Sequence, residues 1–273
     1  MNKIFGIFII TGLILITIGV SIDTSLWQTS IGYRTSEYET INKNFASDEV
    51  KHVIIDSRNA SIRVNLSDND EISLSYRENN YLRYNLTIDE GVLTLKQERI
   101  NHFRFGLINF SSGDRYAIIL NIPKNSLDKL EIDNTNGKVL VVDVELDSLD
   151  IKTTNAIIEI ENMIVTDNLN IRTTNGVIRF NDVKAGDLSA RTTNGMIEFS
   201  KLIANNIIMQ TTNGQVTGAI IGNRDDYHED MSTTNGRIKI NGQQYGNIVR
   251  SRNDINRELN IITTNGNITI DFR

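Results

Sequence analysis

The tetrapeptide Thr173-Thr174-Asn175-Gly176 recurs, with small variations, through the second half of the chain. Its asparagine position returns at residues 136, 155, 175, 194, 213, 235 and 265, in steps of 19, 20, 19, 19, 22 and 30 residues. A nearly constant step of about 20 residues is typical of proteins built from stacked structural repeats. The repeated turn comprises Asn136, Gly137, Asn155, Asn175, Gly176, Asn194, Gly195, Asn213, Gly214, Asn235, Gly236, Asn265 and Gly266.

Apolar residues alternate with polar ones on both sides of this turn. The position six residues before the asparagine and the position three residues after it are nearly always Leu, Ile or Val. Residues 51–64 repeat the pattern in a weaker form around Asn59. Each unit is therefore a strand, a turn and a second strand, and it can bury its apolar face only by stacking on another unit. We predict an all-β fold, a β-solenoid of about 20-residue coils at a spacing of ~4.8 Å.

The turn itself has a structural interpretation. Asn and Gly accept a positive φ more readily than other residues, so we expect that conformation at each turn. Asn side chains on successive coils should form a hydrogen-bonded ladder, and the Thr two residues before each Asn should point inward. An ice-binding array would need two outward Thr separated by one residue, and adjacent Thr residues point to opposite faces.

Residues 66–123 lack the repeat but keep the alternation of strands. Candidate strands are Glu71–Arg77, Leu82–Ile88, Val92–Leu95 and Tyr116–Ile122. We predict that this block is a small antiparallel sheet, inserted beside the regular coils of residues 130–273 or capping them. Within the repeat domain of residues 49–273, Gln243–Arg257 is predicted to be a polar loop. The last strand, Asn267–Phe272, has no cap in this scheme, and Asp271 and Arg273 would blunt its edge.

The N-terminus predicts the location of the protein. Residues 4–22 contain no charged residue and would span about 28 Å as a helix, close to the ~30 Å hydrocarbon core of a bilayer. Lys3 precedes this stretch and Asp23 follows it, which places residues 1–3 in the cytoplasm and the remainder outside. We therefore predict a single-pass cell-membrane protein with a tether at residues 23–48. A cleaved signal peptide, with Gly19-Val20-Ser21 as its best site, is the alternative.

Composition excludes several classes of function. The net charge of −6 disfavours a nucleic-acid partner, which needs a basic face. The chain has no cysteine, which excludes disulfides, thiolate metal sites and cysteine nucleophiles. No nucleotide-binding, metalloprotease or serine-hydrolase motif is present, so we predict no cofactor, no metal site and no catalytic residue. The outward rows are also expected to carry no group of three or four acids in adjacent coils, which a polysaccharide-cleaving β-helix would have.

Three sets of charged residues stand out, and the first of them is the candidate binding site. Lys152, Arg172 and Arg191 stand three residues before successive turn asparagines and should form an outward basic column. This column is either matched to an anionic wall polymer or a lipid head group, or it is a solvated surface column with acidic neighbours. On the other strand, Glu159, Arg179 and Glu198 alternate in sign and should form a stabilising ladder. The segment Arg224–Asp230 is dense in ionisable groups but matches no metal-ligand spacing, so a polar return loop is predicted there.

The repeats resemble a known bacterial family. The strand-Thr-Thr-Asn-Gly-strand units, the step Ile122-Pro123-Lys124 leading into Leu130-Glu131-Ile132, and the N-terminal span are similar to the putative-adhesin family of unknown function. That family includes LiaG-like membrane proteins and the toastrack domain. The resemblance covers about residues 50–273, with Ala156 in place of a turn glycine and a long last step as departures. It implies a β-strand-repeat domain at the cell envelope, and it supplies no catalytic residues.

Together these observations predict a non-enzymatic, membrane-anchored extracytoplasmic protein that acts as an adhesin or as an envelope-stress-associated module. Its partners would be the membrane, through the N-terminal helix, and an envelope polymer or protein. The alternative is a secreted carbohydrate-binding or carbohydrate-active β-helix. The oligomeric state stays open at this stage.

Overall fold

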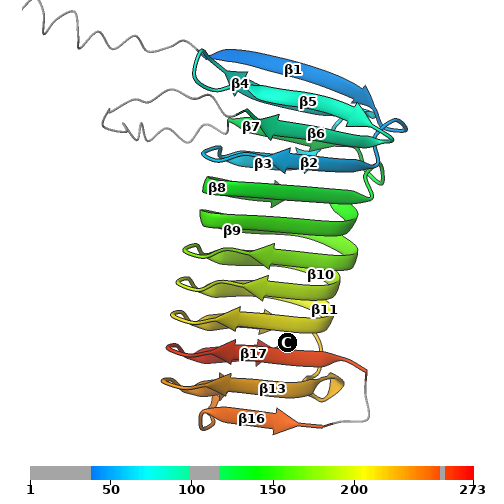
Figure 1. Ribbon diagram of the computed structural model, residues 1–273. Coiled ribbons are helices and arrows are strands. Elements are labelled where there is room, and N and C mark those ends of the chain that lie inside the picture. Colours follow the sequence, from blue (N-terminus) through cyan, green and yellow to red (C-terminus); the bar gives the residue numbers. More distant parts are fainter. Residues whose placement is uncertain (1–37, 99–116, 253–255) are drawn as a thin grey trace, which may run out of the picture. The chain divides into compact units, whose positions relative to one another are not determined.

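The computed structural model describes residues 38–98, 117–252 and 256–273, and these residues form an all-β solenoid. Their strands join into one continuous 18-stranded sheet that turns a corner at each repeat (Figure 1). The prediction of a β-solenoid is therefore confirmed. No helix among these residues is both long and apolar enough to cross a membrane. The predicted span at residues 4–22 and the first part of the predicted tether lie outside the described residues.

Each coil has two long sides, which we name by their place relative to the corner asparagine. The leading face consists of the strand segments before the corner, and the trailing face consists of the segments after it. A short return segment closes the coil. Inward positions on both faces carry the apolar rows expected from the sequence, and these rows form one continuous buried core.

The central coils follow each other in chain order. They are built from β8 (Lys129–Val142), β9 (Glu145–Arg172), β10 (Ile178–Arg191), β11 (Ile197–Thr211) and β12 (Val216–Ile220). These strands pair in parallel with a register that matches the repeat, so that Ile178 of β10 lies opposite Ile158 of β9 and Ile197 of β11. The step of 19 or 20 residues is thus one circuit of the solenoid.

The corner asparagines form an unbroken ladder of side-chain hydrogen bonds. The amide nitrogen of Asn194 donates to the amide oxygen of Asn175 at 2.8 Å, and that of Asn213 donates to Asn194 at the same distance. The complete ladder runs through Asn59, Asn136, Asn155, Asn175, Asn194, Asn213, Asn265 and Asn235. Its order departs from the chain order at the end of the stack.

At the corners of Asn194, Asn213, Asn235 and Asn265, the buried threonine two positions before the asparagine donates to the corner glycine of a neighbouring coil. Thr211 donates a hydrogen bond to the carbonyl oxygen of Gly195 in the preceding coil at 2.8 Å, and Thr263 donates in the same way to Gly214. These hydroxyls satisfy carbonyls that would otherwise be buried without a partner. Their inward direction is as the sequence predicts.

The predicted positive φ is found at the corner glycine Gly137, where φ is 121°, but the reason for glycine differs at the other corners. Gly176, Gly195, Gly214, Gly236 and Gly266 do not have a positive φ. A Cβ atom on Gly195 would instead lie 1.7 Å from the carbonyl oxygen of the corner glycine in the neighbouring coil. The corners stack backbone on backbone, and this close approach excludes a side chain. Positive φ occurs at the opposite corner, in the row Asp143, Asn162, Asp182 and Lys201.

At the N-terminal end, the first coil lies inside the stack. It comprises β2 (His52–Asp56) and β3 (Ile62–Leu66). These strands pair in parallel with β8 on one side, and with β6 (Val92–Gln97) and β7 (Ile118–Ile122) on the other. The outer edges are covered by antiparallel strands: β5 (Tyr84–Asp89) on β6, and β4 (Glu71–Glu78) and β1 (Glu39–Ala46) beyond β7.

Two sequence expectations change at this end. Residues 39–46, which fall in the predicted tether, form β1 and pair with β4 over their whole length. The cap strands predicted between residues 66 and 123 are present, but β6 and β7 continue the stack as a layer parallel to the Asn59 coil. The cap therefore adds one coil-like layer before its antiparallel strands begin.

At the C-terminal end, the last coil of the chain is again not the last of the stack. The coil of β17 (Glu258–Thr263) and β18 (Ile268–Phe272) lies between the coil that ends in β12 and the coil of β13 (His228–Thr233) and β14 (Ile238–Ile240) (Figure 1). Two short antiparallel strands, β15 (Gln243–Gln244) and β16 (Ile248–Ser251), then cover β14 and β13.

This order corrects two predictions. The strand at Asn267–Phe272 is paired on both edges, so Asp271 and Arg273 are not needed to blunt an open edge. Part of the predicted polar loop Gln243–Arg257 supplies the capping strands β15 and β16. The edge of the sheet is thus protected by short antiparallel strands, a common device against edge-to-edge association.

Candidate functional site

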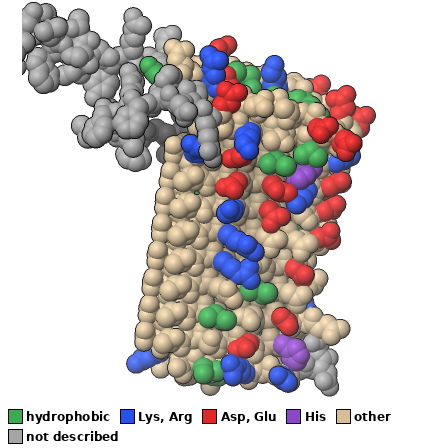
Figure 2. Space-filling view, in the orientation of Figure 1, with side chains coloured by type: hydrophobic (Ala, Val, Ile, Leu, Met, Phe, Trp, Pro, Cys, Tyr) green, Lys and Arg blue, Asp and Glu red, His purple; other side chains and the backbone are tan. Residues whose placement is uncertain are grey.

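The predicted basic column lies on the leading face, in the central coils. We call Lys152, Arg172 and Arg191 the basic row. Arg172 of β9 is opposite Arg191 of β10 in the parallel register, and Lys152 of β9 is opposite Asp133 of β8. Figure 2 shows basic side chains gathered along the middle of this face. Side chains on neighbouring coils of a β stack are ~4.8 Å apart, so the row presents closely spaced positive charges.

The three members of the basic row differ in their partners. Lys152 forms a loose ion pair with Asp133, with 3.7 Å between Nζ and Oδ2. Arg191 donates hydrogen bonds to the neutral side chains of Ser189 and Gln210, at 2.7 and 3.1 Å. For Arg172, whose side chain is exposed, no carboxylate lies within ion-pair distance among the described residues. Arg172 and Arg191 are therefore adjacent cations without a carboxylate partner in this part of the chain.

Acidic residues gather next to the basic row. Asp56 of β2 lies opposite Asp133 of β8, and Glu131 of β8 lies opposite Asp150 of β9. We call these four residues the acidic cluster. They occupy outward positions on three adjacent coils, so the expectation that no such group exists is wrong. Sequence reasoning missed it because each outward row holds only two of the acids, and all four come together only when the two neighbouring rows are combined and the Asn59 coil stacks on the Asn136 coil.

Lysines compensate much of the acidic cluster. Lys96 lies 3.3 Å from Asp56, and Lys129 lies 2.6 Å from Glu131 and 3.9 Å from Asp150. The hydrogen bond from Lys129 holds the pKa of the Glu131 carboxyl below its ordinary value, and the same contact raises the pKa of the Lys129 ammonium. Glu131 is consequently ionised at neutral pH and is a poor proton donor.

A shallow groove connects the two sets of charges. It has a volume of about 340 Å³ and is lined by Glu131, Asp133, Asp150, Lys152, Asn170 and Arg172, together with neighbouring isoleucines. One end of the groove is anionic and the other is cationic. Such a surface can accept hydrogen bonds from hydroxyl groups at one end and bind an anionic group at the other.

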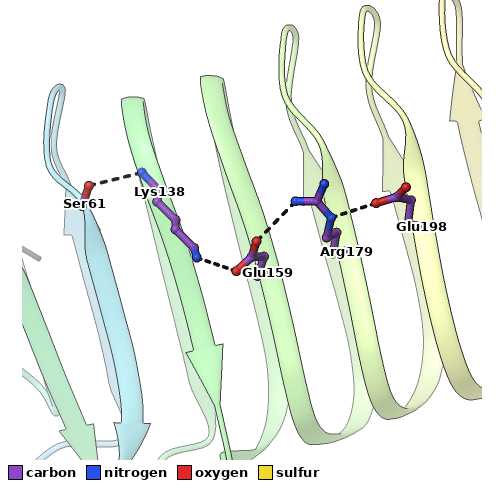
Figure 3. A network of polar contacts seen from close by, with 5 residues as sticks. All are labelled: Ser61, Lys138, Glu159, Arg179 and Glu198. Atoms are coloured by element: carbon purple, nitrogen blue, oxygen red, sulfur yellow. Dashed lines mark hydrogen bonds and ion pairs between the residues drawn. The ribbon is translucent and has the colours of Figure 1, made fainter. Parts of the chain in front are cut away.

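The trailing face carries charges in a different arrangement. Arg179 forms ion pairs with Glu159 at 3.3 Å and with Glu198 at 2.8 Å, and Lys138 binds the other oxygen of Glu159 at 2.6 Å (Figure 3). Charges of opposite sign thus alternate along successive coils, as the sequence predicts for Glu159, Arg179 and Glu198. This ladder satisfies its own charges, which favours a structural role over binding.

The ionisable segment Arg224–Asp230 is also structural. It contains the 3₁₀ turn η1 (Arg224–Asp226). The Arg224 guanidinium binds both oxygens of the buried Glu229 carboxylate, at 2.8 and 2.7 Å, and donates to the Tyr245 hydroxyl at 2.7 Å. The contact with Glu229 raises the pKa of Arg224 above its ordinary value. Among the described residues no group of His, Asp or Glu side chains is arranged to hold a metal ion.

Comparisons with known proteins agree with the geometry. The family model described as Toastrack DUF4097 matches residues 50–271. A search of curated proteins finds no significant match.

Several solved structures are similar at low identity. They include a putative adhesin from Bacteroides fragilis (14% identity, 86% of this chain and 97% of that chain, TM-score 0.49). Others are a putative lipid binding protein from Parabacteroides distasonis (15%, 86% and 97%, TM-score 0.45) and a putative cell adhesion protein from Clostridium sporogenes (12%, 87% and 100%, TM-score 0.41). The family model covers most of the chain and includes every corner asparagine, so this protein belongs to the Toastrack DUF4097 family.

Proposed function

We propose that the protein is a membrane-anchored, extracytoplasmic interaction module of the cell envelope, and that its basic row binds an anionic envelope polymer. Residues 4–22 would provide the anchor and the solenoid would present its leading face to the polymer. The role proposed for the chain is binding, and none of its residues is assigned to a chemical step.

The observation that carries this proposal is the pair Arg172 and Arg191. Like charges on neighbouring strands repel each other, so two adjacent arginines without carboxylate partners cost some stability. An anionic group placed between them would remove that repulsion and form charge-assisted hydrogen bonds. Asn170, Ser189 and Gln210 occupy neighbouring outward positions and add neutral hydrogen-bonding groups. A polymer with regularly spaced phosphate or carboxylate groups fits this row.

The test is binding of the full-length protein, in detergent micelles, to polyphosphate and to neutral dextran. The R172Q/R191Q variant should bind polyphosphate about tenfold or more weakly, because it loses two charge-assisted contacts. A matched control, K124Q/K239Q, removes the same charge from exposed positions away from the basic row. Equal affinities of the two variants would show that net charge, and not the basic row, governs binding.

The acidic cluster favours a second candidate, binding of a neutral carbohydrate. The carboxyl oxygens of Asp150 and Glu131 beside the groove can accept hydrogen bonds from sugar hydroxyl groups. Under this alternative, D150N would weaken binding to glycans on an array, whereas R172Q would leave it unchanged. Turnover of any bound polysaccharide would contradict the non-enzymatic role.

A further inference from the structure

The Asn265 coil occupies a slot between two coils that are consecutive in the chain. β17 pairs in parallel with β11 on one side and with β13 on the other, so that Ile261 lies opposite both Met209 and Met231. β18 is held in the same way between β12 and β14. The asparagine ladder passes through it, with bonds of 2.7 Å from Asn265 to Asn213 and from Asn235 to Asn265.

A lengthened connecting segment, which we call the spacer, joins the two coils that form the slot. The Asn213 and Asn235 coils are joined by residues 221–227, and the step between their asparagines is 22 residues where other steps are 19 or 20. The additional residues let the chain pass the height of the intervening coil. Tyr227, which is fully buried, donates from its hydroxyl to the carbonyl oxygen of Ala204 at 2.9 Å, and Arg224 binds Glu229. The Tyr227 hydroxyl thus connects the spacer to β11 in one wall, and the Arg224–Glu229 pair connects it to β13 in the other. The Tyr227 ring also packs against Phe272 of β18, with 6.2 Å between the ring centroids.

The Asn265 coil is held by non-covalent contacts with the two coils on either side of it, and not by short chain connections to them. Thr263 donates to the carbonyl oxygen of Gly214 and Thr233 donates to that of Gly266, both at 2.8 Å. In the chain, β17 follows β16, which lies on the outer side of the stack, and residues 252–257 join the two strands. The same coil from another copy of the protein would make every one of these contacts. Both walls also precede the occupant in the chain, so they are synthesised first.

The two coils that form the slot accept only a segment with a specific pattern of side chains. They require apolar side chains at the inward positions, a threonine that reaches the neighbouring carbonyl, and glycine at the corner, because a Cβ on Gly266 would lie 1.8 Å from the carbonyl oxygen of Gly214. A second copy of residues 258–273 meets all of these requirements. We propose that this slot is a docking site for the C-terminal coil of a second copy, so that two molecules exchange residues 258–273 reciprocally. Such an exchange conserves the native contacts and forms a closed dimer.

Cysteine cross-linking tests the exchange directly, because the chain contains no cysteine. Gln210 of β11 and Ile262 of β17 lie opposite each other on the leading face. Neighbouring parallel strands are ~4.8 Å apart, within the Cα separation that a disulfide spans. The Q210C/I262C variant of the full-length protein is prepared with and without ¹⁵N, and the two samples are denatured, mixed, refolded in micelles and oxidised. Mass spectrometry then identifies the cross-linked peptides.

The expected result is a cross-link between labelled and unlabelled peptides whose share rises with protein concentration. The matched control is R191C/Q210C, which joins two consecutive central coils in the same register and shares the loss of Gln210. It should give cross-links within one molecule only. If Q210C/I262C also gives only intramolecular cross-links at every concentration, the exchange does not occur. Equal mixing in both variants would indicate random collision and would also overturn the proposal.

Discussion

The central coils and the two ends of the stack are built from the same repeat, yet they are assembled differently. From β8 to β12, each coil lies next to its neighbour in the chain. At both ends, the terminal coil of the chain is inserted between two other coils, and antiparallel strands cover the outside. The difference teaches that the repeat specifies the shape of one coil, whereas spacers and caps specify the order of the coils.

The charged residues also differ between the central coils and the ends of the stack. In the central coils of the trailing face, Glu159, Arg179 and Glu198 neutralise each other along the stack. Near the C-terminal end, the inward row that carries leucine or isoleucine elsewhere carries Glu229, which is buried and paired with Arg224. A regular repeat can thus be maintained by apolar rows alone, whereas the end of the stack uses a specific polar contact to fix the spacer.

The largest expected effect breaks the central corner. In G195V, the new Cβ would lie 1.7 Å from the carbonyl oxygen of Gly176, so the backbones of adjacent coils must separate. We expect a loss of more than about 3 kcal/mol in the free energy of unfolding, or failure to fold. G246V is the matched control near the end of the stack, because nothing lies within 4 Å of its Cβ. Urea unfolding of both variants checks this, and similar stabilities would disprove the stacked-backbone explanation.

A smaller effect tests the polar contact at the end of the stack. E229L installs the residue that several central coils carry at this position, but it leaves the Arg224 guanidinium without its carboxylate. Because the Arg224 side chain is 29% exposed, we expect a loss of about 2 kcal/mol, less than for a fully buried pair. The double variant R224M/E229L should recover most of this loss. If E229L alone is as stable as the parent in urea unfolding, the pair does not fix the spacer.

These comparisons show how far the sequence determines the structure. The turn at Asn175 and the inward threonines follow from local patterns, because a fixed turn and a period of two define the direction of each side chain. The position of the Asn265 coil has no such local marker, since a parallel strand can pair with any strand of similar pattern. The 22-residue step between Asn213 and Asn235 was the available signal of the inserted coil, but a longer loop explains that step equally well. The acidic cluster was missed partly for the same reason, because Asp56 meets Asp133 only through coil order, and partly because the cluster combines two neighbouring rows that hold two acids each.

The smallest expected effect compares the middle of the asparagine ladder with its end. Asn194 has ladder bonds on both sides, to Asn175 and from Asn213, whereas Asn235 at the end has one, to Asn265. At about 0.5–1 kcal/mol for each exposed hydrogen bond, N194A should lose about 1–2 kcal/mol and N235A about half as much. Thermal unfolding of the two variants measures the ratio. A larger loss for N235A would mean that the ladder contributes most where the C-terminal coil is inserted. Asn235 would then hold that coil in place through its hydrogen bond to Asn265, and would not simply be the last residue of the ladder.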